Sequence, residues 1–229
     1  MKTLLTVDWD FFVPIDPMYD LAHQEAPIFL NLLWQARQGL RNFIKTNGIQ
    51  EGFWNRLGGI AEGAGPTWVS DSHLFAHSLL SGIDHVILVD AHHDCWNQAK
   101  KGQVECSDWL RVWLQGGKRR KATWVSPDWS KDHFSVPKDL CDKLTRVSWG
   151  DSWGVKHIDR VHVCRSGCWT PPWLDGEFIK FVQDRGSRVN QMQVGEWDPM
   201  RERWSKDEME ASLEQSKVQK SFLILDPKR

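Results

Sequence analysis

Three candidate metal ligands stand at the end of a short apolar segment in the middle of the chain. Asp90, His92 and Asp94 follow His85–Val89, which is rich in β-branched residues and too short for a long core helix. Such a segment predicts a buried strand. In open α/β sheets, ligands bind where the strands reach their carboxyl ends. Carboxylates together with an imidazole suit Mn²⁺ or Zn²⁺, and the excess of oxygen donors here favours Mn²⁺.

A second acidic pair lies close to the N-terminus. Residues 4–7 predict another strand, and Asp8 and Asp10 follow it. Because alternate residues of an extended chain point to the same side, both carboxylates can face one metal centre. A turn or a helix cap is the simpler explanation of an isolated Asp-x-Asp pair. Two strand ends with this surplus of carboxylates in one chain nevertheless favour a shared metal site.

The rest of the chain predicts strands that alternate with helices. A long helix is expected over residues 27–47, because Pro27 suits a first helical turn, Gly48 follows its end, and apolar residues through Phe43 and Ile44 recur at helical spacing. The glycine-rich residues 52–66 are expected to form a loop. Further helices are expected from Ser70-Asp71 onward and at 107–115, 172–184 and 205–220, and further strands at 122–125, 146–149, 160–164 and 191–194, with 222–225 as a last strand or a docked tail.

This alternation favours an α/β fold of three layers, α/β/α, around a mostly parallel central sheet. The 229 residues suit one domain that spans 1–229.

Charge and hydropathy argue against several classes of partner. With 29 basic and 30 acidic residues, the chain has no overall field that favours nucleic acid or an anionic membrane. No apolar stretch approaches the roughly 20 residues of a membrane span. The basic residues 118–121 are either a solvated loop or a contact for an acidic partner.

Cysteine usage favours a cytoplasmic protein. The five cysteines are odd in number and fit no zinc-finger spacing, so reduced thiols are the simplest account. The first residues reach Asp8 too early for a signal peptide, which also favours the cytoplasm.

Tryptophan is the compositional outlier, with 15 residues against a single tyrosine. Core packing explains many of them. Several, such as Trp96, Trp129 and Trp169, lie among polar or loop residues, and exposed tryptophans often anchor a peptide or protein partner. A tryptophan-lined groove is therefore the alternative to a purely structural role.

Three segments resemble the ureohydrolase superfamily, which contains the arginases and is structurally related to metal-dependent deacetylases. Residues 89–94 are similar to its Asp-Ala-His-x-Asp signature, residues 7–10 resemble its Asp-x-Asp strand end, and residues 70–73 resemble its Gly-Gly-Asp-His segment without the two glycines. In ordinary arginases the Asp-x-Asp strand comes late in the chain, whereas here it comes first. This order resembles a divergent group that includes peptide arginases of bacterial ribosomal-peptide biosynthesis. The implied fold is arginase/deacetylase-like with a permuted strand order.

The resemblance implies a centre of two Mn²⁺ ions. One ion would be held by His73, Asp90, Asp94 and Asp8, and the other by Asp90, His92, Asp8 and Asp10. Asp8 and Asp90 would bridge the two ions. Two such ions can share a water and lower its pKa toward neutrality, so that it attacks a guanidinium carbon. His73 has an alternative role as a helix-capping or packed histidine, and His93, between two ligands, is expected to point away.

The same resemblance requires an acid that holds the guanidinium and a group that protonates the leaving amine. Glu105 is the candidate proton shuttle, at a position where arginases carry histidine, and a surface acid is its alternative role. Asp108 is expected to cap a helix. Glu196 and Asp198 are candidates for guanidinium binding, and Ser166 for lining the pocket.

The function implied is that of a hydrolase acting on C–N bonds of linear amidines, which converts arginine side chains of a precursor peptide to ornithine and releases urea. The family often forms homo-oligomers. Three alternatives stay open: a small-molecule ureohydrolase for arginine or agmatine, a zinc-dependent amidohydrolase or deacetylase, and a non-catalytic peptide-binding module that retains the site as a relic.

Overall fold

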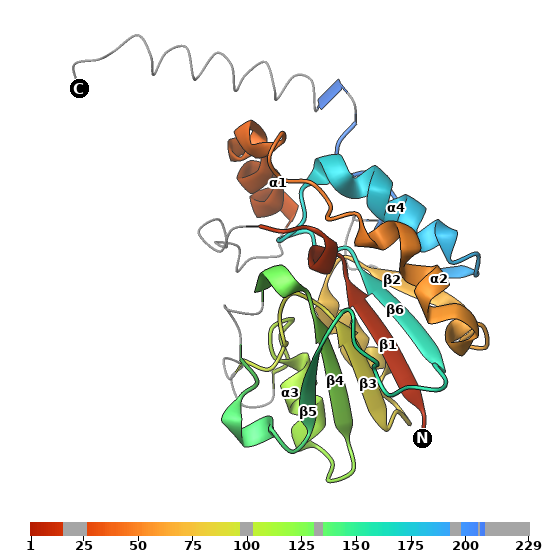
Figure 1. The fold of residues 1–229 in the computed structure, drawn as a ribbon. Coiled ribbons are helices and arrows are strands. Elements are labelled where there is room, and N and C mark those ends of the chain that lie inside the picture. The colour runs from red at the N-terminus through yellow and green to blue at the C-terminus, as the bar shows by residue number, and fades with distance from the viewer. Residues whose placement is uncertain (16–26, 97–102, 131–134, 193–197, 206, 209–229) are drawn as a thin grey trace.

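A sheet of seven parallel strands forms the centre of the molecule (Figure 1). The computed structural model describes residues 1–15, 27–96, 103–130, 135–192, 198–205 and 207–208. Within these residues the strands are β1 (Thr3–Asp8), β2 (Thr67–Ser70), β3 (His85–Val89), β4 (Lys121–Ser126), β5 (Leu144–Ser148), β6 (Arg160–Cys164) and β7 (Val189–Met192). Their order across the sheet is β5-β4-β3-β1-β6-β2-β7, and every neighbouring pair is parallel. The predicted parallel α/β fold is confirmed.

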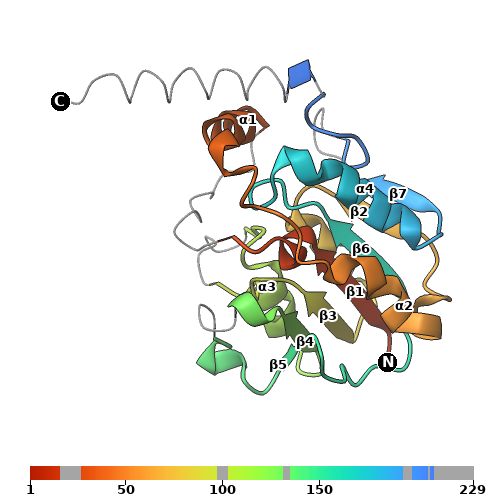
Figure 2. The same cartoon turned by 45° about the horizontal axis from the view of Figure 1, so that its top comes forward.

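Helices cover both faces of this sheet (Figures 1 and 2). On one face, α2 (Phe53–Leu57) and α4 (Asp175–Asp184) pack against the strands. On the other, α3 (Trp109–Gln115) packs together with a 3₁₀ helix, His73–Leu79. A further helix, α1 (Pro27–Ala36), precedes α2 in the chain.

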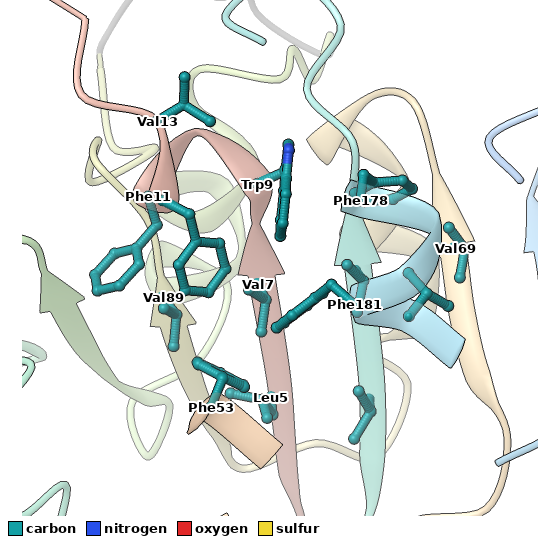
Figure 3. Close-up of a cluster of buried hydrophobic side chains, with 14 of the residues drawn as sticks. Leu5, Val7, Trp9, Phe11, Val13, Phe53, Val69, Val89, Phe178 and Phe181 are labelled. Carbon is teal, nitrogen blue, oxygen red and sulfur yellow. The ribbon is translucent and has the colours of Figure 1, made fainter. Parts of the chain in front are cut away.

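The larger hydrophobic core lies beneath α2 and α4 (Figure 3). Leu5 and Val7 of β1 alternate with residues of the opposite face and meet aromatic rings from both helices. The Phe53 ring of α2 lies 5.3 Å from the Phe181 ring of α4, in an edge-on arrangement. Burial of each such phenylalanine stabilises the fold by about 2 to 3 kcal/mol. Core packing also accounts for four of the tryptophans, which are almost fully buried: Trp9, Trp34, Trp109 and Trp124.

The predicted helix over residues 27–47 is shorter than expected. It begins at Pro27 but ends at Ala36, and a 3₁₀ helix, Gln38–Leu40, follows. Gly39 lies in that segment, where glycine disfavours a continued α-helix. Phe43 belongs to the predicted apolar stripe, yet its side chain is 81% exposed, so the stripe does not extend through it.

Two neighbouring predictions were also wrong. Residues 67–70 form strand β2, although Ser70 was expected to begin a helix. The helix after it starts at His73, because the Ser72 side chain accepts a hydrogen bond from the Leu74 N–H. Within 52–66, α2 and a 3₁₀ helix, Gly58–Ala61, replace the expected loop.

The remaining elements agree with the prediction in kind. Strand β6 has the predicted bounds, whereas β7 begins two residues before the predicted 191–194. The expected helix at 172–184 is a short 3₁₀ helix, Pro172–Leu174, followed by α4. The predicted strand at 222–225 and most of the helix at 205–220 lie outside the described residues. In the part of the chain that is described, no helix is long and apolar enough to cross a membrane.

Candidate metal centre

The carboxyl ends of the central strands bring the predicted ligands together. β1 lies between β3 and β6, and Val7 pairs with Val89 at the end of the β1–β3 ladder. Asp8 ends β1 and Asp90 follows β3, so the two carboxylates emerge side by side. β2 joins the same edge through β6 and leads to His73. From β1 the chain continues to β2 on one side of the sheet, whereas β3, β4 and β5 follow on the other side. Open α/β sheets bind ligands at such a change in strand order.

His73 lies at the centre of the first cluster. Its Nδ1 atom is 3.1 Å from Asp8 Oδ2, 3.0 Å from Asp90 Oδ2 and 2.9 Å from Asp94 Oδ2. All four side chains are buried. Three carboxylate oxygens therefore converge on one imidazole nitrogen away from bulk water.

His92 defines a second cluster that shares Asp90 with the first. Its Nδ1 atom is 2.8 Å from Asp10 Oδ2 and 3.6 Å from Asp90 Oδ1. Two sets of ligand atoms are compact enough for an ion, with all atoms of a set within 4.8 Å of one another: Asp8, His73 and Asp90, and Asp10, Asp90 and His92. The two overlapping triads could each hold a metal ion.

Backbone and indole N–H groups fix the carboxylates. The second oxygens of Asp8 and Asp90 accept from the Asp10 N–H at 3.1 Å and the His92 N–H at 2.7 Å. The Trp109 indole N–H donates to Asp94 Oδ2 at 2.6 Å. Asp94 has a left-handed backbone with φ of 46°, a conformation that is uncommon outside glycine and is often held at functional sites.

The crowding of charge shifts the pKa values of the cluster. Burial, together with the charge of Asp90, raises the pKa of Asp10 to about 6. Burial and then the charges of Asp94 and Asp8 raise the pKa of Asp90. Burial alone would lower the pKa of His73, but the charge of Asp94 and hydrogen bonds to the carboxylates raise it well above its ordinary value. The site therefore disfavours its own negative charges until a cation neutralises them.

The unsatisfied atoms of the site suit a bound cation. Among the described residues, His73 Nδ1, Asp10 Oδ2 and Asp90 Oδ2 are buried and have no hydrogen-bond partner beyond the close Asp–His contacts of the two clusters. Buried polar atoms rarely lack a partner in folded proteins, and a bound ion can supply one. These atoms face one another across the two triads. The donor set thus fits metal binding, and the assignment of individual ligands stays a prediction.

The stabilisation of the protein by Mn²⁺ is expected to depend on pH. A metal ligand must be deprotonated. Because the Asp10 pKa is raised to about 6, protons compete with the metal at a higher pH than at an ordinary aspartate. Mn²⁺ at a hundred times its Kd should add about 2.7 kcal/mol to the free energy of unfolding. Thermal unfolding should show a Tm increase that is larger at pH 8 than at pH 7 and shrinks further as the pH falls through 6, because the raised pKa values of His73 and His92 add their competition to that of Asp10.

Equal ionic strength of NaCl serves as the control for this measurement. A Tm increase that NaCl reproduces, or that does not shrink on acidification, would contradict specific binding at these carboxylates.

The predicted proton shuttle, Glu105, belongs to neither cluster. Glu105 is exposed, and its backbone makes three hydrogen bonds: its N–H donates to Asp108 Oδ1 at 2.8 Å, and its carbonyl accepts from the N–H groups of Asp108 and Trp109. Asp108 occupies the N-cap position of α3, but its carboxylate accepts from the Glu105 N–H of the preceding turn and makes no capping hydrogen bond with the helix, so the expected cap is not formed. The catalytic role of Glu105 stays a prediction.

Two of the predicted substrate-binding residues, Ser166 and Asp198, lie in loops. Ser166 follows the end of β6, is buried, and has a φ of 57°. Asp198 accepts from the Met200 N–H at 2.8 Å, which forms a turn. Glu196 lies outside the described residues. The substrate roles of all three stay predictions.

One loop residue reaches the site. The Ser166 carbonyl accepts from the Trp169 N–H, and this turn places the Trp169 ring 4.7 Å from the His92 ring. The sequence marks Trp169 as a loop tryptophan, but no local pattern places it beside His92.

Comparisons with protein-family profiles, with curated proteins and with solved structures found no match. The functional conclusion therefore depends on the residues and their geometry.

Proposed function

We propose that this protein is a two-metal hydrolase that converts arginine side chains within a peptide to ornithine and urea. The observation that carries the proposal is the pair of buried Asp/His triads that share Asp90 at the carboxyl edge of the sheet. A single structural ion would need only one such triad. A shared carboxylate between two sets is what a pair of adjacent divalent ions requires.

The donor set favours Mn²⁺. His73, Asp8, Asp90 and Asp94 would hold one ion, and His92, Asp10, Asp90 and Asp8 would hold the other. Four carboxylates offset the charge of two divalent ions, and oxygen-rich sets suit Mn²⁺ better than Zn²⁺. When bound, such ions lower the pKa of a water and stabilise the charge that develops in hydrolysis.

Accessibility indicates the side from which a substrate approaches. His92 has a side chain that is 16% exposed, whereas the carboxylates of Asp10 and Asp90 beside it are 2% and 1% exposed. The half-buried Trp169 ring lies against His92 on this side. A guanidinium group is attracted to a tryptophan face, so this ring supports an arginine substrate. A long side chain presented by a peptide suits a site in which His92 is more exposed than the carboxylates beside it.

The proposed reaction consumes one water for each arginine. Water adds to the guanidinium carbon, the bond from that carbon to Nε breaks, urea leaves, and Nε takes up a proton to become the ornithine amine. Glu105 is the proposed source of that proton, and Asp198 and Glu196 the proposed guanidinium contacts, with Ser166 lining the pocket. Burial of the carboxylates keeps bulk water out of the site, which strengthens their interactions with a cation.

Incubation with Mn²⁺ and an arginine-containing peptide tests the proposal. Each conversion should lower the peptide mass by the mass of urea minus that of water, with an equal amount of urea released. The Asp10→Asn variant removes a charge from the second triad while keeping side-chain size, so it is expected to be inactive.

Other outcomes would replace the proposal. Urea released from free arginine or agmatine but not from peptides would indicate a small-molecule ureohydrolase. One equivalent of zinc with activity on acetylated lysine would indicate a deacetylase. Peptide binding without turnover under any metal would indicate a non-catalytic module.

A further inference from the structure

A row of buried polar side chains lies behind His73. Thr6 Oγ1 is 2.7 Å from His73 Nε2 and 2.8 Å from His162 Nδ1. On the far side, Ser70 Oγ is 2.9 Å from His162 Nε2 and donates to the Ser72 carbonyl at 2.7 Å. Thr6, Ser70 and His162 are fully buried. The row therefore links the metal-facing imidazole to the backbone through three side chains that water does not reach.

The sheet register builds this row across three adjacent strands. Thr6 of β1 pairs directly with His162 of β6. Ser70 of β2 lies two residues beyond Trp68, the residue that pairs with His162. Central strands of parallel sheets are normally continuous in apolar residues. Buried polar residues in such strands need hydrogen-bond partners, and here they find them in one another and in the Ser72 carbonyl.

We propose that Ser70, His162 and Thr6 form a relay that keeps a hydrogen on Nε2 of His73, so that Nδ1 is the nitrogen that a bound metal ion would take. His162 and Thr6 are thus positioning residues for the metal centre. The inference rests on the proposed two-metal site. Ligating histidines generally need such a partner on their second nitrogen, which sets the tautomer and the ring orientation.

The direction of the relay follows from counting hydrogens. Ser70 has one hydroxyl hydrogen and donates it to the Ser72 carbonyl, so its oxygen accepts the Nε2–H of His162. Neutral His162 then has an Nδ1 lone pair that accepts the single hydroxyl hydrogen of Thr6. The Thr6 oxygen can only accept from His73 Nε2.

The opposite direction conflicts with two features of the structure. In that direction the Ser70 hydroxyl would donate to His162, and Ser70 Oγ and the Ser72 carbonyl oxygen would lie 2.7 Å apart without a hydrogen between them. Alternatively, it would need a doubly protonated His162. A doubly protonated His162 would be a fully buried cation whose two ring nitrogens face only the hydroxyl groups of Thr6 and Ser70. Only the first direction satisfies every atom of the row.

Nitrogen-15 NMR of the full chain tests the relay without any substitution. Long-range correlations within each imidazole ring report which nitrogen carries the hydrogen. His162 is expected to be neutral with its hydrogen on Nε2, both without metal and with the diamagnetic ion Zn²⁺. With Zn²⁺ bound, His73 is expected to carry its hydrogen on Nε2 as well. A hydrogen on Nδ1 of His162 would overturn the inference.

A matched pair of variants tests the consequence for metal binding. Thr6→Val keeps the shape of the side chain but removes the hydroxyl, whereas Thr6→Ser retains it. Loss of such a partner typically weakens metal binding by about 10- to 100-fold, so Mn²⁺ titration calorimetry should show that loss for Thr6→Val and a near wild-type Kd for Thr6→Ser. Equal affinity of all three proteins would overturn the relay.

Failure of the relay and failure of the proposed function are distinguishable. A wild-type protein that binds no pair of ions, or does not hydrolyse arginine, contradicts the proposed function, while the His162 tautomer still tests the relay. A wild-type protein that binds two ions with a Thr6→Val variant of equal affinity contradicts the relay alone. If Thr6→Val does not fold, the tautomer of His162 decides.

Discussion

Replacement of Asp90 by asparagine is expected to abolish hydrolysis and Mn²⁺-dependent stabilisation while leaving the metal-free fold at least as stable as the wild type. Asp90 belongs to both triads, so one substitution removes a charge from each. Loss of metal-ion catalysis worth several kcal/mol corresponds to a decrease of kcat by about 10³-fold or more. Asparagine keeps an oxygen that can accept from the His92 N–H, as Asp90 Oδ1 does.

The sign of the effect on stability separates a metal ligand from a structural carboxylate. Burial and the neighbouring Asp94 and Asp8 raise the pKa of Asp90 in the folded protein. A group with a raised folded-state pKa contributes stability at low pH and loses that contribution as the pH rises through the folded pKa. Above that pKa the charge of Asp90 destabilises the metal-free protein, and asparagine removes this cost.

Thermal unfolding with and without Mn²⁺, near pH 7.5, checks this expectation. The wild type should gain stability from Mn²⁺, and Asp90→Asn should not. Asp184→Asn is the matched control, because Asp184 is 48% exposed and pairs with Lys180 on the helix surface. It should change stability by less than about 0.5 kcal/mol. A metal-free Asp90→Asn protein that is several kcal/mol less stable would identify Asp90 as structural.

The centre of the sheet was predictable because its strands are unambiguous in the sequence. β1 and β3 are short, apolar and β-branched, and each ends in a carboxylate, so pattern alone predicted both strands and the edge on which Asp8 and Asp90 emerge. The juxtaposition of the N-terminal Asp pair with the central Asp-x-His-x-Asp segment needed one more step. Parallel neighbours share their carboxyl edge, and the β1–β3 pairing supplies that neighbourhood.

Strand β2 was missed because four residues carry too little pattern. Trp68 and Val69 are its only large apolar residues, and Leu74, Leu79 and Leu80 beyond them favoured a helix beginning at Ser70. The polar residues inside the strands were a signal that went unused. Thr6 lies between Leu5 and Val7, and a polar residue at the centre of a buried strand must have a buried partner.

The positions of Ser166 and Trp169 could not be predicted from the sequence, because a loop determines where their side chains lie. Ser166 and Trp169 are positioned by one turn after β6, whose hydrogen bonds depend on the left-handed backbone at Ser166. Ion pairs between residues far apart in the chain could not be predicted from the sequence either. Arg165 contacts Asp71, 94 residues earlier in the chain, and no local pattern indicates such a partner.

A second large effect is expected at Asp175, which joins the loop at residues 166–170 to the C-terminal part of the described chain. Its carboxylate is 1% exposed and accepts from Arg203 Nη2 at 2.6 Å and from Arg165 Nη1 at 3.4 Å. Arg203 also donates to the carbonyls of Gly167 and Thr170, on either side of Trp169. Asp175 thus stabilises the Arg203 guanidinium, which holds the loop that places Trp169 beside His92.

Replacement of Asp175 by alanine should lower the free energy of unfolding by about 3 to 5 kcal/mol, because it leaves a buried guanidinium without its carboxylate. Urea unfolding should show a lower midpoint with an unchanged slope. Asp184→Ala, which breaks only the exposed pair with Lys180, is the control and should cost less than about 1 kcal/mol.

The double variant Asp175→Ala/Arg203→Met separates the buried charge from the lost contacts. Removal of both charged groups should recover part of the loss, because no unpaired guanidinium then remains at position 203. The double variant would still lack the hydrogen bonds to Gly167 and Thr170, so the loop at residues 166–170 should stay loosened. The KM for the proposed peptide substrate should then be raised. Additive losses in the double variant would show that Asp175 and Arg203 act independently, and the loop would then owe its position to other contacts.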